Sequence, residues 1–494
     1  MLATPLRAHR GLLLTLVLAA SFWAFDLGAL RTGVPDPLDD TWEYGVAARS
    51  LIEGRGFRTQ VIHPPLWSLR DRAHSVPLLI HGPLLPLALA PRIRLFGPRA
   101  LDLVPVLAAE LALLAAYFVY RLGARAFGAP VGAAAAALWT LAPLTLRAVH
   151  HDVALAAGAA LLAGALDLLL RPRRYAALAG AVLGIGYLVR PEMLLAAPVL
   201  AALAGRRWWS LALGFVACAL PWWVHNAAAA GSPFFNLSSY LAIGYWDGRP
   251  GLSVLRDFDL APARWPEALR HALPSLPAKW LDFFPHAAKR ALMAPSAATG
   301  WLAVVGLGAA LREPATRRIA AGTLGLAAIP VAIMTVTLYD SRYLTPFLPL
   351  WALAAAIGAR TLAGALPGRA RHAAVWMAAL AALALPATVP AERNAAREAR
   401  VLERRLAFER AALAPLAGGG KGGALLFSDL PDFAAWTAER PVVWLTREEY
   451  ERLPAAGEPN PGGLPVRDAE AETWFHVAGR DSARSDLGFR GAVR

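Results

Sequence analysis

Long apolar runs dominate this chain, and they restrict its fold more than any other feature. Runs long enough to cross a bilayer occupy residues 11–30, 101–120, 129–149, 153–170, 291–311, 319–338, 345–365 and 372–390. Three more runs, the middle one short, lie between residues 174 and 224. Because a helix crosses a bilayer with roughly 20 apolar residues, the sequence predicts an all-α polytopic membrane protein with about 11 transmembrane helices.

Composition and charge support this fold class. The chain is 57% hydrophobic and 17% charged, whereas soluble domains carry roughly 25% charged residues. The formal charge of +14 comes almost entirely from arginine, since lysine occurs only at positions 279, 289 and 421. These arginines lie in short loops between apolar runs, a pattern that orients a membrane protein. We therefore expect membrane lipids as partners and no nucleic acid.

The basic linkers alternate regularly along the chain. They contain Arg121/Arg125, Arg171/Arg173/Arg174, Arg206/Arg207, Arg312/Arg317/Arg318 and Arg369/Arg371. If the first apolar run is an uncleaved span with its N-terminus in the cytoplasm, and 11 helices cross, all five linkers are cytoplasmic, as the positive-inside rule requires. This arrangement predicts an inner-membrane protein whose loops 31–100 and 225–290 lie outside, together with the chain from residue 391.

One apolar segment, Val76–Phe96, conflicts with that count if it crosses the membrane. It contains four prolines, together with His81, Arg92 and Arg94, and counting it as a span would move all five basic linkers outside. We therefore expect a juxtamembrane or re-entrant segment that is covered by protein.

The tail differs in character from the rest of the chain. Residues 1–390 read as the transmembrane domain and 391–494 as a small soluble extracytoplasmic α/β domain. Its predicted strands are Ala424–Ser428, Pro441–Leu445 and Thr473–Val477. Thr446 and Glu449 have the spacing of a capping box that opens a short helix. The single cysteine, Cys218, excludes an intrachain disulfide and a cysteine metal cluster.

The first outer loop carries Asp39, Asp40 and Glu43 at a predicted helix start. Taken alone, these carboxylates fit an N-cap and a capping box, both favoured by the helix dipole. Further on, His63-Pro64-Pro65-Leu66 opens the proline-broken region, and its simplest interpretation is a helix entry with proline in the first turn.

Later outer loops hold further charged residues. The second loop is the short segment around His150-His151-Asp152, where the carboxylate either pairs with Arg147, caps a helix or has a function at the membrane surface. Arg190-Pro191-Glu192 fits a mutual ion pair beside a helix break as well as it fits a functional pair. Arg342-Tyr343 fits either an interfacial anchor or a guanidinium that faces a phosphate.

Taken together, these motifs resemble GT-C-fold glycosyltransferases of bacterial type that use polyprenyl-phosphate-linked sugars. That superfamily includes the protein O-mannosyltransferases and the aminoarabinose transferase acting on lipid A. The resemblance rests on the order of Asp39-Asp40, Ala48-Arg49-Ser50-Leu51, Glu53-Gly54-Arg55-Gly56-Phe57, His63-Pro64-Pro65-Leu66, Asp152, Leu188-Val189-Arg190-Pro191-Glu192, Gly231-Ser232-Pro233-Phe234-Phe235 and Arg342-Tyr343-Leu344. It covers roughly residues 10–390, and the family's first motif is often Asp-Glu rather than Asp-Asp.

The resemblance implies transfer of a hexosyl or pentosyl group from a polyprenyl phosphate to a lipid, glycan or protein acceptor of the cell envelope. Displacement would invert the anomeric carbon, with a loop-one aspartate as base. The expected catalytic residues are Asp40, Asp39 and Asp152. The expected donor-phosphate ligands are Arg342, Arg190 and His63. Groups expected to contact the acceptor or to support these residues are Glu43, His151, Tyr343 and Glu192.

No cofactor is assigned beyond a divalent cation, Mg²⁺ or Mn²⁺, that Asp39, Asp40 and Asp152 could share. The alternative function is a transporter or flippase of lipid-linked sugars without catalytic activity, which would place polar residues at mid-membrane depth. A third interpretation is an O-antigen ligase or polymerase, whose key residues lie in one late outer loop. Here the carboxylates lie in the first two loops.

Overall fold

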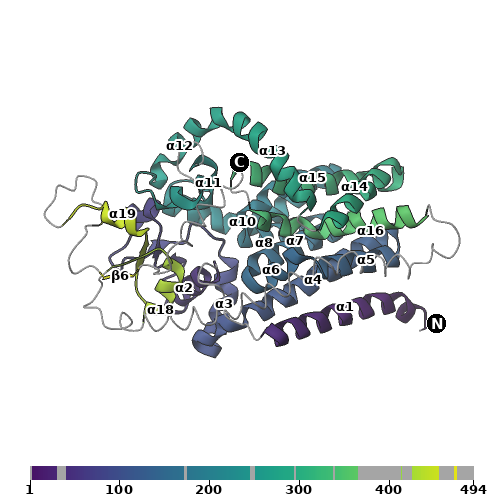
Figure 1. Cartoon of the computed structure of the whole chain (residues 1–494), viewed down its shortest axis with the longest axis horizontal. Helices are drawn as coiled ribbons and strands as arrows, with labels where there is room; N and C mark the ends of the chain where they lie inside the picture. Colours follow the sequence, from purple (N-terminus) through teal and green to yellow (C-terminus); the bar gives the residue numbers. More distant parts are fainter. Residues whose placement is uncertain are drawn as a thin grey trace.

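The computed structural model describes residues 3–30, 40–171, 175–244, 251–293, 296–337, 340–364, 413, 425–455, 465 and 472–474. Within these residues the chain is mostly helical. Long helices run side by side in one bundle, and a small sheet with two short helices lies at the opposite end of the molecule from the N-terminus (Figure 1).

The bundle is built from the apolar runs predicted as spans. Its helices are α1 (Ala3–Leu30), α4 (Val104–Phe127), α5 (Ala129–Thr140), α6 (Pro143–His151), α7 (Val153–Leu169), α8 (Ala176–Val189), α9 (Ala196–Ala204), α10 (Trp208–Ala230), α14 (Ala297–Arg312), α15 (Pro314–Val336) and α16 (Leu348–Gly364). The predicted run 372–390 lies outside the described residues.

Within the described chain, four helical stretches are long and apolar enough to cross a membrane. They are Leu84–Phe127, Pro191–Ala230, Thr316–Val336 and Ser341–Gly364. The number rises to six if two bent pairs each count as one span: α5 with α6, and Pro262–Met293, which ends with α13 (Leu276–Met293), with α14. The apolar helices establish an integral membrane protein, while the count of 11 spans stays a prediction.

Small residues bring the helices of the bundle close together. A side chain at Gly180 of α8 would meet the Leu211 carbonyl oxygen at 1.9 Å, and one at Gly214 of α10 would meet the Ala177 carbonyl oxygen at 2.0 Å. Backbone contact of this kind is how helices pack where lipid removes the hydrophobic driving force.

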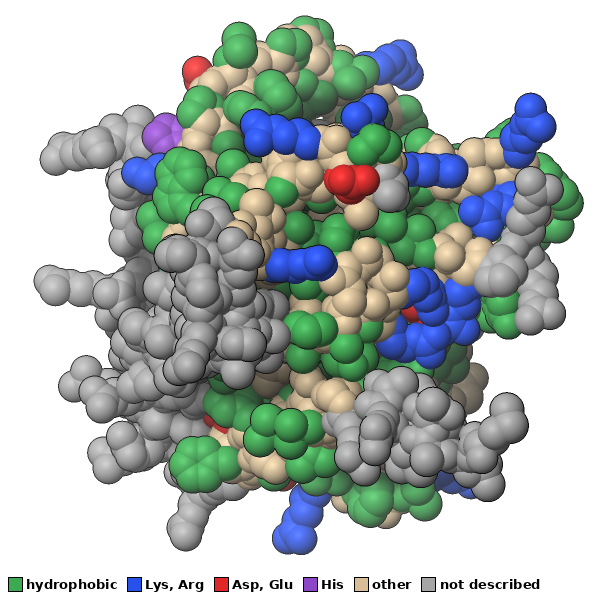
Figure 2. All heavy atoms as spheres, turned by 90° about the vertical axis from the view of Figure 1, so that its right-hand side faces the viewer, with side chains coloured by type: hydrophobic (Ala, Val, Ile, Leu, Met, Phe, Trp, Pro, Cys, Tyr) green, Lys and Arg blue, Asp and Glu red, His purple; other side chains and the backbone are tan. Residues whose placement is uncertain are grey.

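The basic linkers gather at one end of the bundle. Asp167, near the end of α7, is completely buried and pairs with Arg125 at 2.9 Å, Arg171 at 2.6 Å and Arg121 at 3.6 Å. Lys and Arg side chains are spread over this face of the molecule, and Asp and Glu are few (Figure 2). Arg207 donates to the carbonyls of Leu169 and Arg171, and Arg318 to that of Leu203, so described arginines of four linkers lie at this end. Arg173, Arg174, Arg369 and Arg371 lie outside the described residues.

The other end is formed by the first loop, the later outer loop and the tail. The first loop contains α2 (Thr41–Ile52), β1 (Arg58–Thr59), β2 (Val61–Ile62), the 3₁₀ helix η1 (Pro64–Leu69), β3 (Val76–Pro77) and α3 (Leu84–Phe96), which leads through η2 (Gly97–Leu103) into α4. The later loop contains η6 (Leu237–Ser239), α11 (Tyr240–Gly244), η7 (Gly251–Arg256), η8 (Pro262–Arg264), α12 (Trp265–Ala272) and η9 (Leu273–Ser275), and it continues into α13. The tail contains β4 (Leu426–Ser428), α18 (Pro431–Ala438), β5 (Val442–Trp444), α19 (Arg447–Glu451) and β6 (Glu472–Trp474).

The sheet joins the tail to the first loop. Its strand order is β2-β5-β4-β6, and all three pairings are parallel. The three strands predicted in the tail are present, but the fourth strand, β2, comes from the first outer loop. The capping box of Thr446 and Glu449 is confirmed.

Packing beneath the sheet also combines the three regions. One hydrophobic cluster contains Leu66 of the first loop, Leu237 of the later loop and Phe427 of the tail. A second contact is made by α18, whose Phe433 meets Trp42 of α2 edge to face at 5.1 Å. Arg49 of α2 donates a hydrogen bond to the Trp436 carbonyl at 3.1 Å. The described tail residues and the first loop therefore pack as one structural unit.

Candidate active site

Helix α2 carries the first candidate carboxylates. Asp40 occupies the N-cap position, but its side chain makes no capping hydrogen bond, and its backbone is already helical. Glu43, 1% exposed, points to two imidazoles instead of back to the N-cap. Its oxygens lie 3.0 Å from His81 Nε2 and 3.7 Å from His63 Nε2. The capping interpretation of Asp40 and Glu43 is wrong, because an imidazolium is a stronger partner for a buried carboxylate than a backbone amide.

Glu43 and His81 form a buried charged pair. Burial, the largest single effect, would raise the pKa of Glu43, but the charge of His81 and the contacts with both imidazoles together outweigh it and lower the pKa to about 2. Burial would lower the pKa of His81, yet the charge of Glu43, with smaller effects of Asp40 and Asp432, raises it to about 9. Both groups are therefore ionised at neutral pH, which places a fixed imidazolium in the first loop.

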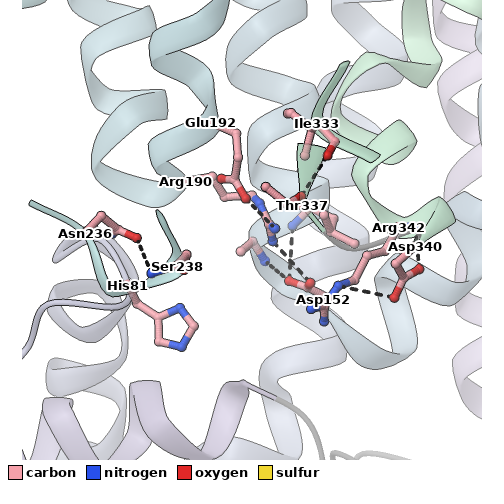
Figure 3. Close-up of polar contacts among 12 residues, drawn as sticks. His81, Asp152, Arg190, Glu192, Asn236, Ser238, Ile333, Thr337, Asp340 and Arg342 are labelled. Carbon is pink, nitrogen blue, oxygen red and sulfur yellow. Dashed lines mark hydrogen bonds and ion pairs between the residues drawn. The ribbon is translucent and has the colours of Figure 1, made fainter. Parts of the chain in front are cut away.

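A chain of ion pairs connects the second loop to the next hairpin. Asp152 caps α7, its Oδ1 accepting from the Ala154 amide at 3.1 Å and the Leu155 amide at 3.3 Å. Its Oδ2 lies 3.2 Å from Arg190 Nη1. Arg190 Nη2 lies 3.2 Å from Glu192 Oε1 (Figure 3). The capping of α7 and the Arg190–Glu192 pair are confirmed, whereas the partner of Asp152 is Arg190 and not Arg147.

Arg342 lies at the start of η10 (Ser341–Phe347), beside Arg190. Asp340 caps this turn by accepting from the Arg342 amide at 2.9 Å, and its Oδ2 lies 3.5 Å from Arg342 Nε (Figure 3). The ring of Tyr343 is shared by two guanidinium groups, that of Arg342 at 5.6 Å and that of Arg190 at 6.0 Å. An aromatic face stabilises two neighbouring cations that would otherwise repel each other.

These groups surround one cavity of about 170 Å³. Seven predicted site residues line it: Asp40, Glu43, His63, Arg190, Glu192, Arg342 and Tyr343. Asp152 lies behind Arg190 and does not line the cavity, and neither does His151. Asp39 lies outside the described residues.

Sequence reasoning missed several lining residues, chiefly Tyr44, His81, Ser238, Asp429, Asp432 and Trp444. The last three come from the tail, and no local pattern predicts that they face α2. His81 had a signal, since His81-Gly82-Pro83 interrupts the apolar segment at its start. A side chain at Gly82 would meet the Leu188 carbonyl oxygen at 1.9 Å. Only glycine at position 82 allows this segment to approach the backbone of α8 at Leu188, two residues before Arg190.

Asp40 lies between the two groups of charges. It interacts electrostatically with Asp152 and Arg342 on one side, and with His81 and Asp432 on the other. In Figure 3, His81 and Ser238 lie to one side of Arg190, and Asp152 and Arg342 lie to the other. A carboxylate, two guanidiniums and an imidazolium thus share one cavity, a set that can accept a proton and stabilise an anion.

The divalent cation considered from the sequence stays a prediction, because Asp39, one of its three expected ligands, lies outside the described residues. No group of three His, Cys, Asp or Glu side chains among them is arranged to hold a metal ion. Asp152 is already engaged, one oxygen by the α7 amides and the other by Arg190.

Part of the chain matches a protein-family model. A family model described as dolichyl-phosphate-mannose-protein mannosyltransferase matches residues 80–225. The match includes His81-Gly82-Pro83, Asp152 and Arg190, and it leaves His63 outside. Among curated proteins, none matches the sequence.

Several solved structures share the architecture. The oligosaccharyltransferase of Archaeoglobus fulgidus, in a complex with Zn and sulfate, is 14% identical with a TM-score of 0.55 over 88% of this chain and 62% of its own. ArnT from Cupriavidus metallidurans bound to undecaprenyl phosphate is 14% identical with a TM-score of 0.52 over 89% of this chain and 86% of its own. The protein has the GT-C fold. This GT-C chain spans less than two thirds of the archaeal chains that it matches.

The Glu43–His81 pair predicts how the stability of this GT-C protein depends on pH. Since the folded pKa of His81 is raised, its contribution is complete below pH 6.5 and is lost as pH rises through about 9. Since the folded pKa of Glu43 is lowered, the contribution of Glu43 to stability is present above pH 4.5 and is lost as pH falls toward about 2.

In wild type, the free energy of unfolding should fall between pH 6.5 and about 9 as His81 loses its proton. In the variant Glu43→Gln, this fall should be smaller, because the charge that stabilises the His81 imidazolium is gone. Thermal unfolding in detergent across this range measures it. Glu267→Gln, at an exposed position of α12, is the matched control and should behave as wild type. Superimposable pH profiles of Glu43→Gln and wild type would contradict the charged pair.

Proposed function

We propose that this protein is a membrane glycosyltransferase that moves a sugar from a polyprenyl phosphate to a lipid, glycan or protein acceptor. The observation that carries the proposal is that Asp40 lines the same cavity as Arg342 and Arg190, at the end of a GT-C fold opposite the basic linkers. The solved relatives add support, since ArnT is bound to undecaprenyl phosphate and the archaeal AglB to dolichol-phosphate and an inhibitory peptide.

Asp40 serves as the base. Its side chain makes no capping hydrogen bond, so a carboxylate oxygen is available to the acceptor hydroxyl. As that hydroxyl oxygen attacks the anomeric carbon, its proton passes to Asp40 and the bond from the anomeric carbon to the phosphate oxygen breaks. The proton then leaves with the polyprenyl phosphate. Asp39 is the other candidate base, because it is adjacent to Asp40 in the sequence.

Arg342 is the principal ligand of the departing phosphate. Arg190 already lies between two carboxylates at 3.2 Å each, so most of its charge is neutralised. Among the described residues, the one carboxylate that pairs with Arg342 is Asp340, at the longer distance of 3.5 Å, and the Arg342 side chain is partly exposed to the cavity. A guanidinium that is not fully paired gains most from binding a phosphate.

The remaining charged groups of the cavity support Asp40 and Arg342. Asp152 and Glu192 orient Arg190, and Tyr343 separates it from Arg342. His81 adds a third positive charge, held by Glu43. Such preorganised charges stabilise the leaving group without any rearrangement during the reaction.

Replacing Asp40 by Asn should lower kcat by about 10²–10⁴-fold, because the base is lost, with little change in donor binding. Release of free polyprenyl phosphate from a lipid-linked sugar measures turnover. Asp282→Asn, at an exposed position of α13 away from the cavity, is the matched control and should keep wild-type activity. Wild-type turnover in Asp40→Asn, Asp39→Asn and Asp152→Asn alike would refute the carboxylate mechanism.

We further propose that the cavity faces the outside of the inner membrane and that the N-terminus is cytoplasmic. Helix α7 supports this, because Asp152 begins it and Asp167, with its three arginines, lies 15 residues later, about 22 Å away along the axis. The arginine-rich end is the cytoplasmic one by the positive-inside rule.

Single cysteines test this orientation after Cys218→Ser removes the native one. Glu448→Cys in the tail should react with an impermeant maleimide from outside intact cells, and Arg317→Cys only after the cells are opened. Both positions are exposed. Labelling of both from the same side would overturn the topology.

A further inference from the structure

One wall of the cavity is built by the tail together with His63. Pairing of β2 with β5 aligns Ile62 with Val443, so the next residues, His63 and Trp444, become neighbours. Their rings meet edge to face with centroids 5.3 Å apart. Asp432, from the first turn of α18, lines the same cavity.

This wall carries buried polar atoms that make no hydrogen bond within the described part of the chain. His63 is 3% exposed, and neither of its ring nitrogens has a hydrogen-bond partner among the described residues. Its nearest charged neighbour, Glu43, is 3.7 Å away, which is too far for a hydrogen bond. Oδ1 of Asp432 is likewise buried and without a partner in the described chain. Buried polar groups in native proteins are normally satisfied, so unsatisfied ones that line a cavity indicate a ligand.

The chemistry of the wall selects the kind of ligand. Burial, together with the charges of Glu43 and Asp40, raises the pKa of Asp432 well above its usual value and favours the protonated carboxyl. That group has one donor and free acceptor capacity, and the ring nitrogens of an imidazole can also bind hydroxyl groups. Trp444 adds a large apolar face. Hydroxyl groups on an apolar ring match this combination, whereas a phosphate would be repelled by Glu43 and Asp40.

The size and position of the cavity agree with such a ligand. Its volume of about 170 Å³ is below the roughly 300–1,000 Å³ of pockets for drug-sized ligands. Arg342 lines the same cavity. A single sugar ring can therefore occupy the wall while the phosphate attached to it reaches the guanidinium.

We propose that His63, Asp432 and Trp444 bind the sugar ring of the lipid-linked donor, so that the tail selects which sugar is transferred. This inference rests on the proposed function and extends it to residues outside the transmembrane bundle. In this proposal Trp444 and Asp432 bind the sugar, while Arg342 binds the phosphate.

The test compares undecaprenyl phosphate with and without a single hexose, using the full-length protein. Asp432→Ala should weaken binding of the glycosylated lipid about tenfold or more, the effect of one or two lost hydrogen bonds. Binding of sugar-free undecaprenyl phosphate should not change. Asp432→Asn should restore most of the affinity, because an amide imitates a protonated carboxyl. Glu448→Ala, exposed on α19, is the control.

Equal losses for both lipids in Asp432→Ala would show that Asp432 only supports the fold, and would overturn the subsite. Unchanged binding of the glycosylated lipid would overturn it as well. If wild type releases no polyprenyl phosphate from any donor, the proposed function fails. The difference in affinity between the two lipids still tests the sugar subsite in that case.

Discussion

Two residues of strand, Val61 and Ile62, connect the first loop to a segment almost 400 positions later in the chain. Their parallel pairing with Val442 and Val443 extends the tail sheet and places Trp444 beside His63. The same tail presses α18 against α2, the helix that begins at Asp40. Backbone pairing is directional and sets register, so this contact determines which side chains face each other across the cavity. Without it, the carboxylates of α2 would lack their opposite wall.

Ion pairing explains how the charged side chains of the site are arranged. Burying an unpaired charge is far more costly than burying a pair, and most of the buried charges described at this end of the bundle are paired. Glu43 has His81, and Asp152 and Glu192 share Arg190. Arg342 is the least tightly paired, and Asp40 does not cap its own helix. The pairing pattern thus separates residues that hold the site together from the two that are free to act on a substrate.

Much of this arrangement could be predicted from local sequence. Apolar runs and arginine-rich linkers predict the bundle and its basic end, because both depend on properties of single segments. Arg190 and Glu192 are two residues apart, so their ion pair was also predictable. The partner of Asp152 was not, since Arg190 and Arg147 are equally plausible until the hairpin is folded. The positions of Asp432 and Trp444 could not be predicted from local sequence, because only the β2–β5 pairing brings them to α2. The capping interpretation of Asp40 and Glu43 failed because His81 approaches from another segment through Gly82.

The proposed mechanism requires one cavity that holds both the phosphate and the sugar of the donor. A structure of the protein with a bound polyprenyl-phosphate-linked sugar tests this most directly. We expect the phosphate within hydrogen-bond distance of Arg342 and the sugar against Trp444 and Asp432, with the reacting carbon toward Asp40. A phosphate bound at the opposite end, among Arg121, Arg125 and Arg171, would contradict the account.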